Sequence, residues 1–143
     1  MATIIALILS ISMELGVPPK FVLAIAYAEH WNGSIEETII RADRRSPINS
    51  NGSRDLGVMQ LNSKYYCHVN WWDAEVNIRT GVQHIKWLME HCATYWEVAV
   101  AYNCGLDRSR GGPPKTSLNY ASNVMDIWHE LEGYDYVNLA IRK

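Results

Sequence analysis

Apolar residues recur three and four positions apart along most of this chain, a spacing that predicts amphipathic helices. We expect five main helical segments, at about residues 4–15, 18–31, 74–92, 96–103 and 117–131. Pro18 and Pro19 suit the first turn of the second helix, and Thr116 or Ser117 is expected to cap the last one. A capping-box sequence at residues 34–37 predicts a further short helix that ends near position 42.

Turn-forming residues interrupt this helical pattern between positions 45 and 73. The pair Asn51-Gly52 is a strong tight-turn signal, so we expect a small β-hairpin there. Residues 62–73 indicate a loop or short helix, residues 105–115 indicate a loop, and no element is predicted after Gly133. The pattern therefore predicts a mainly α fold, a single domain over residues 1–143, with a small irregular or β-hairpin lobe at 45–73.

Composition and charge narrow the classes of function. The chain has 143 residues, of which 48% are apolar and 20% charged, values that exclude a disordered or collagen-like protein. The formal net charge is −2, without the basic surplus of a nucleic-acid binder, so we expect no nucleic-acid partner. Six Trp and eight Tyr stand against one Phe. Such side chains pair a flat apolar face with a polar edge, which suits a sugar or peptide surface as well as a core.

Neither a metal site nor a membrane span is expected. The three cysteines form no Cys-x-x-Cys pair, and the five histidines lack the spacing of zinc ligands. His84, His91 and Cys92 share one face of the helix at 74–92, which we interpret as a solvated face. The apolar run at residues 4–11 resembles a signal-peptide core, but no basic residue precedes it and no cleavage site follows. It is also too short to span a bilayer, and we interpret it as a buried helix.

Glu29 is the first candidate for chemistry. Val22, Ile25, Ala26 and Glu29 are spaced i, i+3, i+4 and i+7, so the carboxyl continues the apolar stripe of its helix. Partial desolvation would raise its pKa and keep it protonated near neutral pH, as a general acid requires. The alternative is that Glu29 lies at a frayed helix end and reaches water. The spacing alone favours this second interpretation.

The second candidate is Asp55, in the turn-rich segment GSRDLGVMQLNS at residues 52–63. A carboxylate there can stay solvated and ionised, and one protonated and one ionised carboxyl across a cleft is the arrangement used in glycoside hydrolysis. Gln60 could hydrogen-bond hydroxyl and acetamido groups, and Gly57 would allow close backbone approach. Alternating oxygen ligands at 49–55 also resemble a calcium loop, but Gln60 stands where a bidentate Glu is needed.

Five short motifs, in order along the chain, resemble the catalytic domain of the soluble lytic transglycosylase family, within the lysozyme-like superfamily. They are a helix that ends in Glu29, Gly-Val-Met-Gln at 57–60, Asn-Ile-x-x-Gly at 77–81, Ala-Tyr-Asn at 101–103, and Tyr120. They cover about residues 14–128. The resemblance implies a lysozyme-like fold that acts on peptidoglycan glycan strands and needs no cofactor.

The resemblance also implies roles for individual residues. Glu29 would be the acid and base that cuts the MurNAc–GlcNAc β-1,4 bond and closes a 1,6-anhydro ring. The remaining site residues would bind the sugar or line the cleft: Met59, Gln60, Tyr102, Asn103 and Tyr120. For Tyr102, packing between helices is an equally good interpretation. Two alternatives remain: a muramidase that adds water with the help of Asp55, and a glycan-binding module without turnover.

Two positions depart from the family pattern. Members usually have Ser directly after the catalytic Glu, and this chain has His30. Many members lack an acid at the position of Asp55, whereas c-type lysozymes and the small members linked to secretion and conjugation machines keep one. The resemblance to those members implies a monomer in the periplasm or cell envelope, with an envelope-spanning machine as a possible partner. The lysozyme-like stretch before Cys67 leaves open a disulfide to Cys92 or Cys104.

Overall fold

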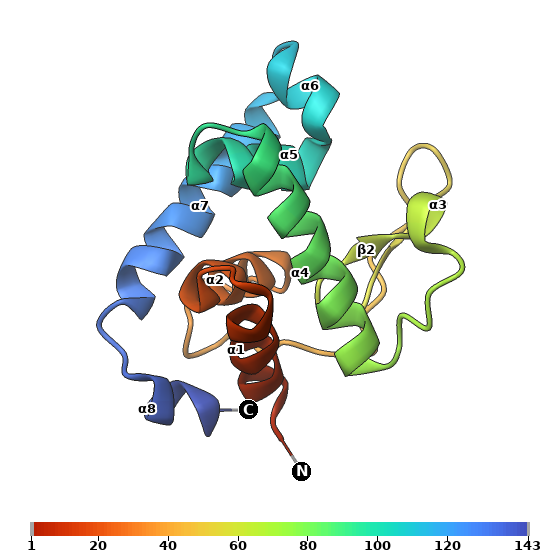
Figure 1. Cartoon of the computed structure of the whole chain (residues 1–143). Helices are drawn as coiled ribbons and strands as arrows, with labels where there is room; N and C mark the ends of the chain where they lie inside the picture. Colours follow the sequence, from red (N-terminus) through yellow and green to blue (C-terminus); the bar gives the residue numbers. More distant parts are fainter. Residues whose placement is uncertain (1, 143) are drawn as a thin grey trace.

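The computed structural model describes residues 2–142, which form eight helices and one two-stranded sheet (Figure 1). The five longer helices have the following bounds: α1 Ile4–Leu15, α2 Pro19–Glu29, α4 Ala74–His91, α5 Tyr95–Cys104 and α7 Lys115–Leu131. The shorter elements are β1 Asp55–Leu56, β2 Leu61–Asn62, α3 Ser63–Tyr66, α6 Leu106–Arg110 and α8 Tyr136–Ala140. The predicted mainly α, lysozyme-like architecture with a small hairpin lobe is confirmed.

Helix α2 lies at the centre of the helical lobe. Every residue from Lys20 to Tyr27 is buried, because α1 and α7 both pack against this helix. A helix that is apolar on all sides belongs in a core, and the sequence of α2 has that character. Its last residue, Glu29, is therefore held at the edge of the core by a helix with little freedom to move.

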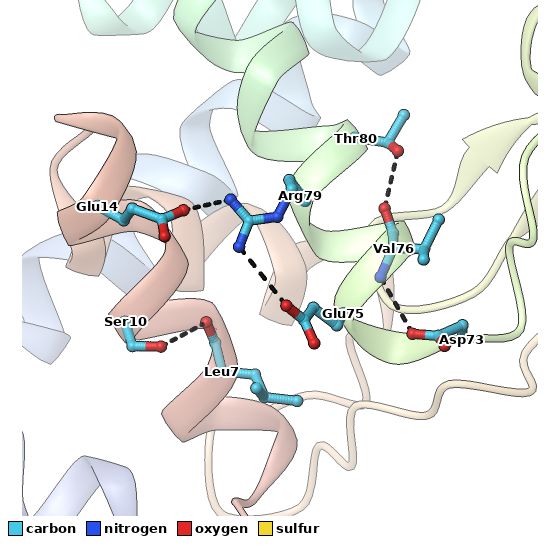
Figure 2. Close-up of polar contacts among 8 residues, drawn as sticks. All are labelled: Leu7, Ser10, Glu14, Asp73, Glu75, Val76, Arg79 and Thr80. Carbon is cyan, nitrogen blue, oxygen red and sulfur yellow. Dashed lines mark hydrogen bonds and ion pairs between the residues drawn. The ribbon is translucent and has the colours of Figure 1, made fainter.

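Helix α1 begins at a Thr3 cap and ends at Gly16, whose φ of 75° is the left-handed conformation common after helices. It packs against α4, and Arg79 of α4 lies between Glu14 of α1 and Glu75 one turn away, as Figure 2 shows. These pairs are exposed and contribute little to stability. The apolar faces of the two helices, which include Ile8 and Ile78, hold them together.

The paired strands of the hairpin lie after the Asn51-Gly52 signal. A turn does form at residues 49–52, and its two arms are joined by an isolated bridge between Arg45 and Leu56 and by backbone hydrogen bonds such as Ser46 N to Asp55 O at 2.9 Å. The paired strands are β1 and β2, joined by the turn at residues 57–60. Gly57 has φ 76° and Gln60 has φ 50°, so a glycine and a glutamine both adopt positive φ in this turn. The prediction missed the turn because Gln is uncommon in that conformation.

Three other local predictions were wrong. Residues 34–37 make one turn, with Ser34 Oγ accepting from the Glu37 amide, but the β-branched residues Thr38, Ile39 and Ile40 do not continue it. The expected loop at 105–115 contains α6. Helix α7 begins after Pro114 with no side-chain cap, because Ser117 bonds to another helix instead.

Candidate active site

A cleft of about 490 Å³ opens between the hairpin lobe and helices α4 and α5. Five of the seven side chains expected at the site line it, namely Glu29, Asp55, Gln60, Tyr102 and Asn103. Tyr120 reaches the same place from α7 through a hydrogen bond to Glu29. Residues that are 91 positions apart in the sequence are therefore brought to one carboxyl group.

Glu29 is partly buried at the C-terminal end of α2, and its carboxyl faces the cleft. The Tyr120 hydroxyl donates to Oε2 at 2.7 Å. Desolvation raises the pKa of Glu29 to about 7, with a smaller contribution in the same direction from the charge of Asp55. The Tyr120 hydrogen bond and the positive charge of Arg44 oppose this rise. The helix is regular up to Glu29, so the alternative of a frayed end does not apply. Because the pKa is about 7, the carboxyl is present in both protonated and ionised forms near neutral pH.

Tyr120 is suited to remain a hydrogen-bond donor. Burial and the neighbouring Glu29 raise its pKa well above the usual value, so the phenol stays neutral. A neutral donor fixed on a carboxyl favours the ionised form and orients it. Tyr120 thus limits the rotation of the Glu29 carboxyl and moderates the rise of its pKa.

Asp55 lies on β1, where it pairs in register with Asn62 of β2. The Asn62 side chain donates to Asp55 Oδ1 at 3.1 Å and to Ser53 Oγ at 3.0 Å. The Asp55 backbone amide donates to Ser46 Oγ at 2.8 Å. Cross-strand pairing thus fixes the Asp55 carboxyl on the hairpin side of the cleft.

Gln60 and Met59 have mainly structural contacts in the turn. The Gln60 side-chain amide donates to Gly57 O at 2.8 Å and to Arg44 O at 3.3 Å, which ties the turn to the preceding loop. Met59 is fully buried and does not line the cleft. Its amide donates to Asn77 and its carbonyl accepts from Tyr102, so Met59 helps to position the turn.

The Asn-Ile-x-x-Gly motif on α4 holds this turn. Asn77 Oδ1 accepts from Met59 N at 2.7 Å, while its Nδ2 donates to Leu56 O at 2.9 Å and to Trp71 O at 3.0 Å. One turn later, a Cβ at Gly81 would lie 2.6 Å from Met59 Cβ. The motif therefore combines a three-way polar clamp with the space that Met59 needs.

Tyr102 and Asn103, near the end of α5, connect the cleft to both lobes. The Tyr102 hydroxyl donates to Met59 O at 2.6 Å, so this residue both lines the cleft and packs between elements. Asn103 Oδ1 accepts from the buried Ser117 hydroxyl of α7 at 2.7 Å. These bonds fix the α5 side of the cleft relative to the turn and to α7.

His30, which replaces the usual serine of the family, is turned into the protein. It is 4% exposed, and its Nε2 donates to Val58 O at 2.9 Å while its Nδ1 accepts from the Arg41 amide at 3.3 Å. Burial lowers its pKa to about 4, so it is neutral at neutral pH. A lone histidine beside a helix end is more often a surface residue, but this one is buried. His30 joins the end of α2 to the hairpin turn and does not line the cleft.

Asn62, whose amide could also hydrogen-bond hydroxyl and acetamido groups, lines the cleft. Sequence reasoning missed four other residues that line it: Tyr65, Tyr66, His84 and Cys104. It also missed Arg44, whose charge acts on Glu29. The adjacent tyrosines at 65 and 66, a few residues after the Gly-Val-Met-Gln motif, were an available signal. His84 was noticed on its helix, but the face assigned to solvent turns partly into the cleft.

The part of the chain that the structure describes contains no group of three His, Cys, Asp or Glu that could hold a metal ion. Cys67, Cys92 and Cys104 are all free thiols, so the disulfide left open by the sequence is not formed. Within residues 2–142, no helix is both long and apolar enough to cross a bilayer.

A carboxyl with a pKa near neutrality that shares a cleft with a second carboxyl is an arrangement used in glycoside hydrolysis. The sequence model of the transglycosylase SLT domain matches residues 7–117, and the chain belongs to this family. The family is one of lytic transglycosylase-type domains that act on peptidoglycan in the cell envelope. Neither a curated protein nor a solved structure gives a significant match.

Proposed function

We propose that this protein is a lytic transglycosylase that cleaves the MurNAc–GlcNAc β-1,4 bond of peptidoglycan and leaves a 1,6-anhydro end. The observation that carries the proposal is the Glu29 carboxyl, held in the cleft by the Tyr120 hydroxyl at 2.7 Å. Family membership supports the substrate class.

In the first half of the reaction, protonated Glu29 gives its proton to the glycosidic oxygen as the bond from that oxygen to C1 of MurNAc breaks. A pKa of about 7 supports this role, because a substantial fraction of the carboxyl is protonated at neutral pH. Positive charge develops on the sugar ring, and the nearby carboxylate of Asp55 is in place to stabilise it.

In the second half, the Glu29 carboxylate takes the proton of the muramyl 6-hydroxyl while that oxygen attacks C1. The anhydro ring closes, Glu29 is protonated again, and no water is consumed. Tyr120 favours the ionised form of Glu29 and so assists this base step. One residue performs both proton transfers, and the chemistry needs no cofactor.

A second candidate function is hydrolysis, in which Asp55 acts as nucleophile or orients a water molecule. The observation in its favour is that Asp55 lines the same cleft and is fixed by Asn62 at 3.1 Å. A third candidate is a glycan-binding module without turnover, because His30 stands where the family usually has a serine after the catalytic Glu.

The first test is the Glu29→Gln variant, assayed for release of soluble fragments from purified peptidoglycan. The amide is nearly isosteric but cannot cycle a proton, so we expect activity to fall by roughly two to four orders of magnitude. Glu130→Gln changes an exposed glutamate of α7 and is the matched control. Wild-type activity in Glu29→Gln, with both variants folded, would contradict the proposal.

A further inference from the structure

An aromatic strip leads out of the cleft along one face of α4. His84, Trp87 and His91 are spaced i, i+3 and i+7, so they lie on one side of the helix. The His84 and Trp87 rings are nearly parallel, at 14°, with centroids 6.0 Å apart. The Trp87 and His91 centroids are 4.2 Å apart. We call these three residues the α4 aromatic strip.

The inner end of the α4 aromatic strip belongs to the cleft. His84 lines the cleft, and its ring lies 5.7 Å from that of Tyr102 and 6.5 Å from that of Tyr66. Burial lowers the pKa of His84, so its ring is uncharged at neutral pH. A molecule that fills the cleft therefore meets the strip at an uncharged aromatic ring.

The outer end of the strip is open to solvent but held in place. Trp87 is 45% exposed, and His91 is exposed as well. His91 Nδ1 donates to Trp87 O at 2.7 Å, which fixes the imidazole beside the indole. Large exposed aromatic side chains that gather beside a cleft are typical of binding surfaces. Because these rings are already ordered, a ligand would lose little conformational entropy by stacking on them.

We propose that the α4 aromatic strip is a distal saccharide subsite, which binds sugar rings of the glycan strand beyond those held in the cleft. This inference rests on the proposed function and adds a preference for long strands. The strip spans about 10 Å along the helix axis, which gives room for more than one sugar ring. The apolar faces of sugar rings would stack on Trp87, while their hydroxyl groups stay in water.

The continuity of the strip with the cleft argues for a glycan in preference to another occupant. A strand that runs through the cleft past Tyr66 and His84 reaches Trp87 directly. Hydrogen bonds would contribute less here than at the cleft, where Asp55, Asn62 and Asn103 gather. We therefore expect the strip to add affinity for long strands without selecting a particular substituent.

The test is binding of defined peptidoglycan oligosaccharides, a tetrasaccharide and an octasaccharide, measured by calorimetry on the Glu29→Gln background to prevent cleavage. We expect the octasaccharide to bind more tightly, and Trp87→Ala to remove this gain, a loss of roughly tenfold. Trp87→Phe should keep most of the gain. Trp72→Ala, at another exposed tryptophan that does not line the cleft, is the matched control and should bind as the parent does.

Each outcome separates this inference from the proposed function. If the parent binds both oligosaccharides but Trp87→Ala keeps the full length dependence, the subsite is refuted and the function stands. If Trp87→Ala weakens the binding of both oligosaccharides equally, the strip is not a distal subsite. The same holds if Trp72→Ala loses as much affinity for the octasaccharide as Trp87→Ala does. If the parent binds neither oligosaccharide, the proposed function fails and the inference fails with it. In NMR spectra, the indole N–H resonance of Trp87 should also shift when the octasaccharide is added, but not when the tetrasaccharide is added.

Discussion

Glu29 and Asp55 are both carboxylic acids that line one cleft, but two walls of different construction hold them. The helical wall consists of the end of α2 with Tyr120 of α7, and it is built on buried apolar residues. The hairpin wall consists of β1, β2 and the turn at residues 57–60, and it is built on hydrogen bonds. Asn77 holds it to α4.

Because the two walls are built differently, the two carboxyls have different surroundings. The apolar wall desolvates Glu29 and raises its pKa to about 7. The hairpin wall gives Asp55 an amide donor from Asn62 at 3.1 Å. The two carboxyls of one cleft therefore differ in their surroundings, with desolvation acting on Glu29 and an amide donor on Asp55.

Breaking the hairpin wall alone should have the largest effect on stability. Asn77→Ala leaves the Met59 amide and the carbonyls of Leu56 and Trp71 without this partner in buried surroundings. We expect a loss of roughly 2–4 kcal/mol in the free energy of unfolding, measured by urea denaturation. Gln83→Ala, at an exposed position of the same helix, should change it little. Equal stability of the two variants would show that the clamp is not required.

Glu29 and His30, adjacent at the end of α2, should both make the free energy of unfolding depend on pH. The pKa of Glu29 is raised from 4.5 to about 7, so its contribution is present below pH 4.5 and is lost as the pH rises through 7. The pKa of His30 is lowered from 6.5 to about 4, so its contribution is present above pH 6.5 and is lost as the pH falls towards 4. Between pH 4.5 and 6.5 the two trends oppose each other.

Replacing Glu29 should therefore isolate its own contribution to this pH dependence. We expect the stability of Glu29→Gln, relative to the wild type, to increase from pH 4.5 to 7 by up to about 3 kcal/mol. Denaturant unfolding at a series of pH values measures this difference, in which the contributions of groups shared by both proteins cancel. A stability difference that stays constant over this range would contradict the desolvation of Glu29.

A finer change within the helical wall is Tyr120→Phe. Its hydrogen bond lowers the pKa of Glu29, so removing the hydroxyl should raise that pKa further. We expect the limb of the pH–activity profile that reports Glu29 to move to higher pH, and the rate to fall roughly tenfold because the carboxyl is less well oriented. Tyr134→Phe removes a similar bond to the exposed Glu36 and should leave the profile unchanged. An unchanged profile in Tyr120→Phe would be inconsistent with this role.

The sequence predicted the helical wall better than the hairpin wall. Apolar spacing is enough to place α1, α2, α4, α5 and α7, because each of these helices buries a long apolar face. Helices α6 and α8 have only five residues each, too few for a periodic signal. The hairpin depends on positive φ at Gln60 and on long-range hydrogen bonds to Asn77, which no local pattern records.

The same distinction applies to single residues of the site. The apolar stripe made Glu29 a candidate, and the ordered motifs then selected it together with Tyr120, which hydrogen-bonds to it in the structure. The burial of His30 could not be predicted, because it depends on two backbone partners, Val58 and Arg41, that lie outside its own helix. Met59 was expected at the sugar because it belongs to a motif, whereas it packs against α4 beneath the turn.

The most direct test of the central claim is the mass of the products formed in water enriched in heavy oxygen. If Glu29 serves as both acid and base, the wild type releases fragments that carry a 1,6-anhydro end, are one water lighter than a reducing end, and contain no label. Asp55→Asn should release the same anhydro fragments at a reduced rate. Labelled reducing ends from the wild type, lost in Asp55→Asn, would show instead that Asp55 directs the addition of water and that the enzyme is a hydrolase.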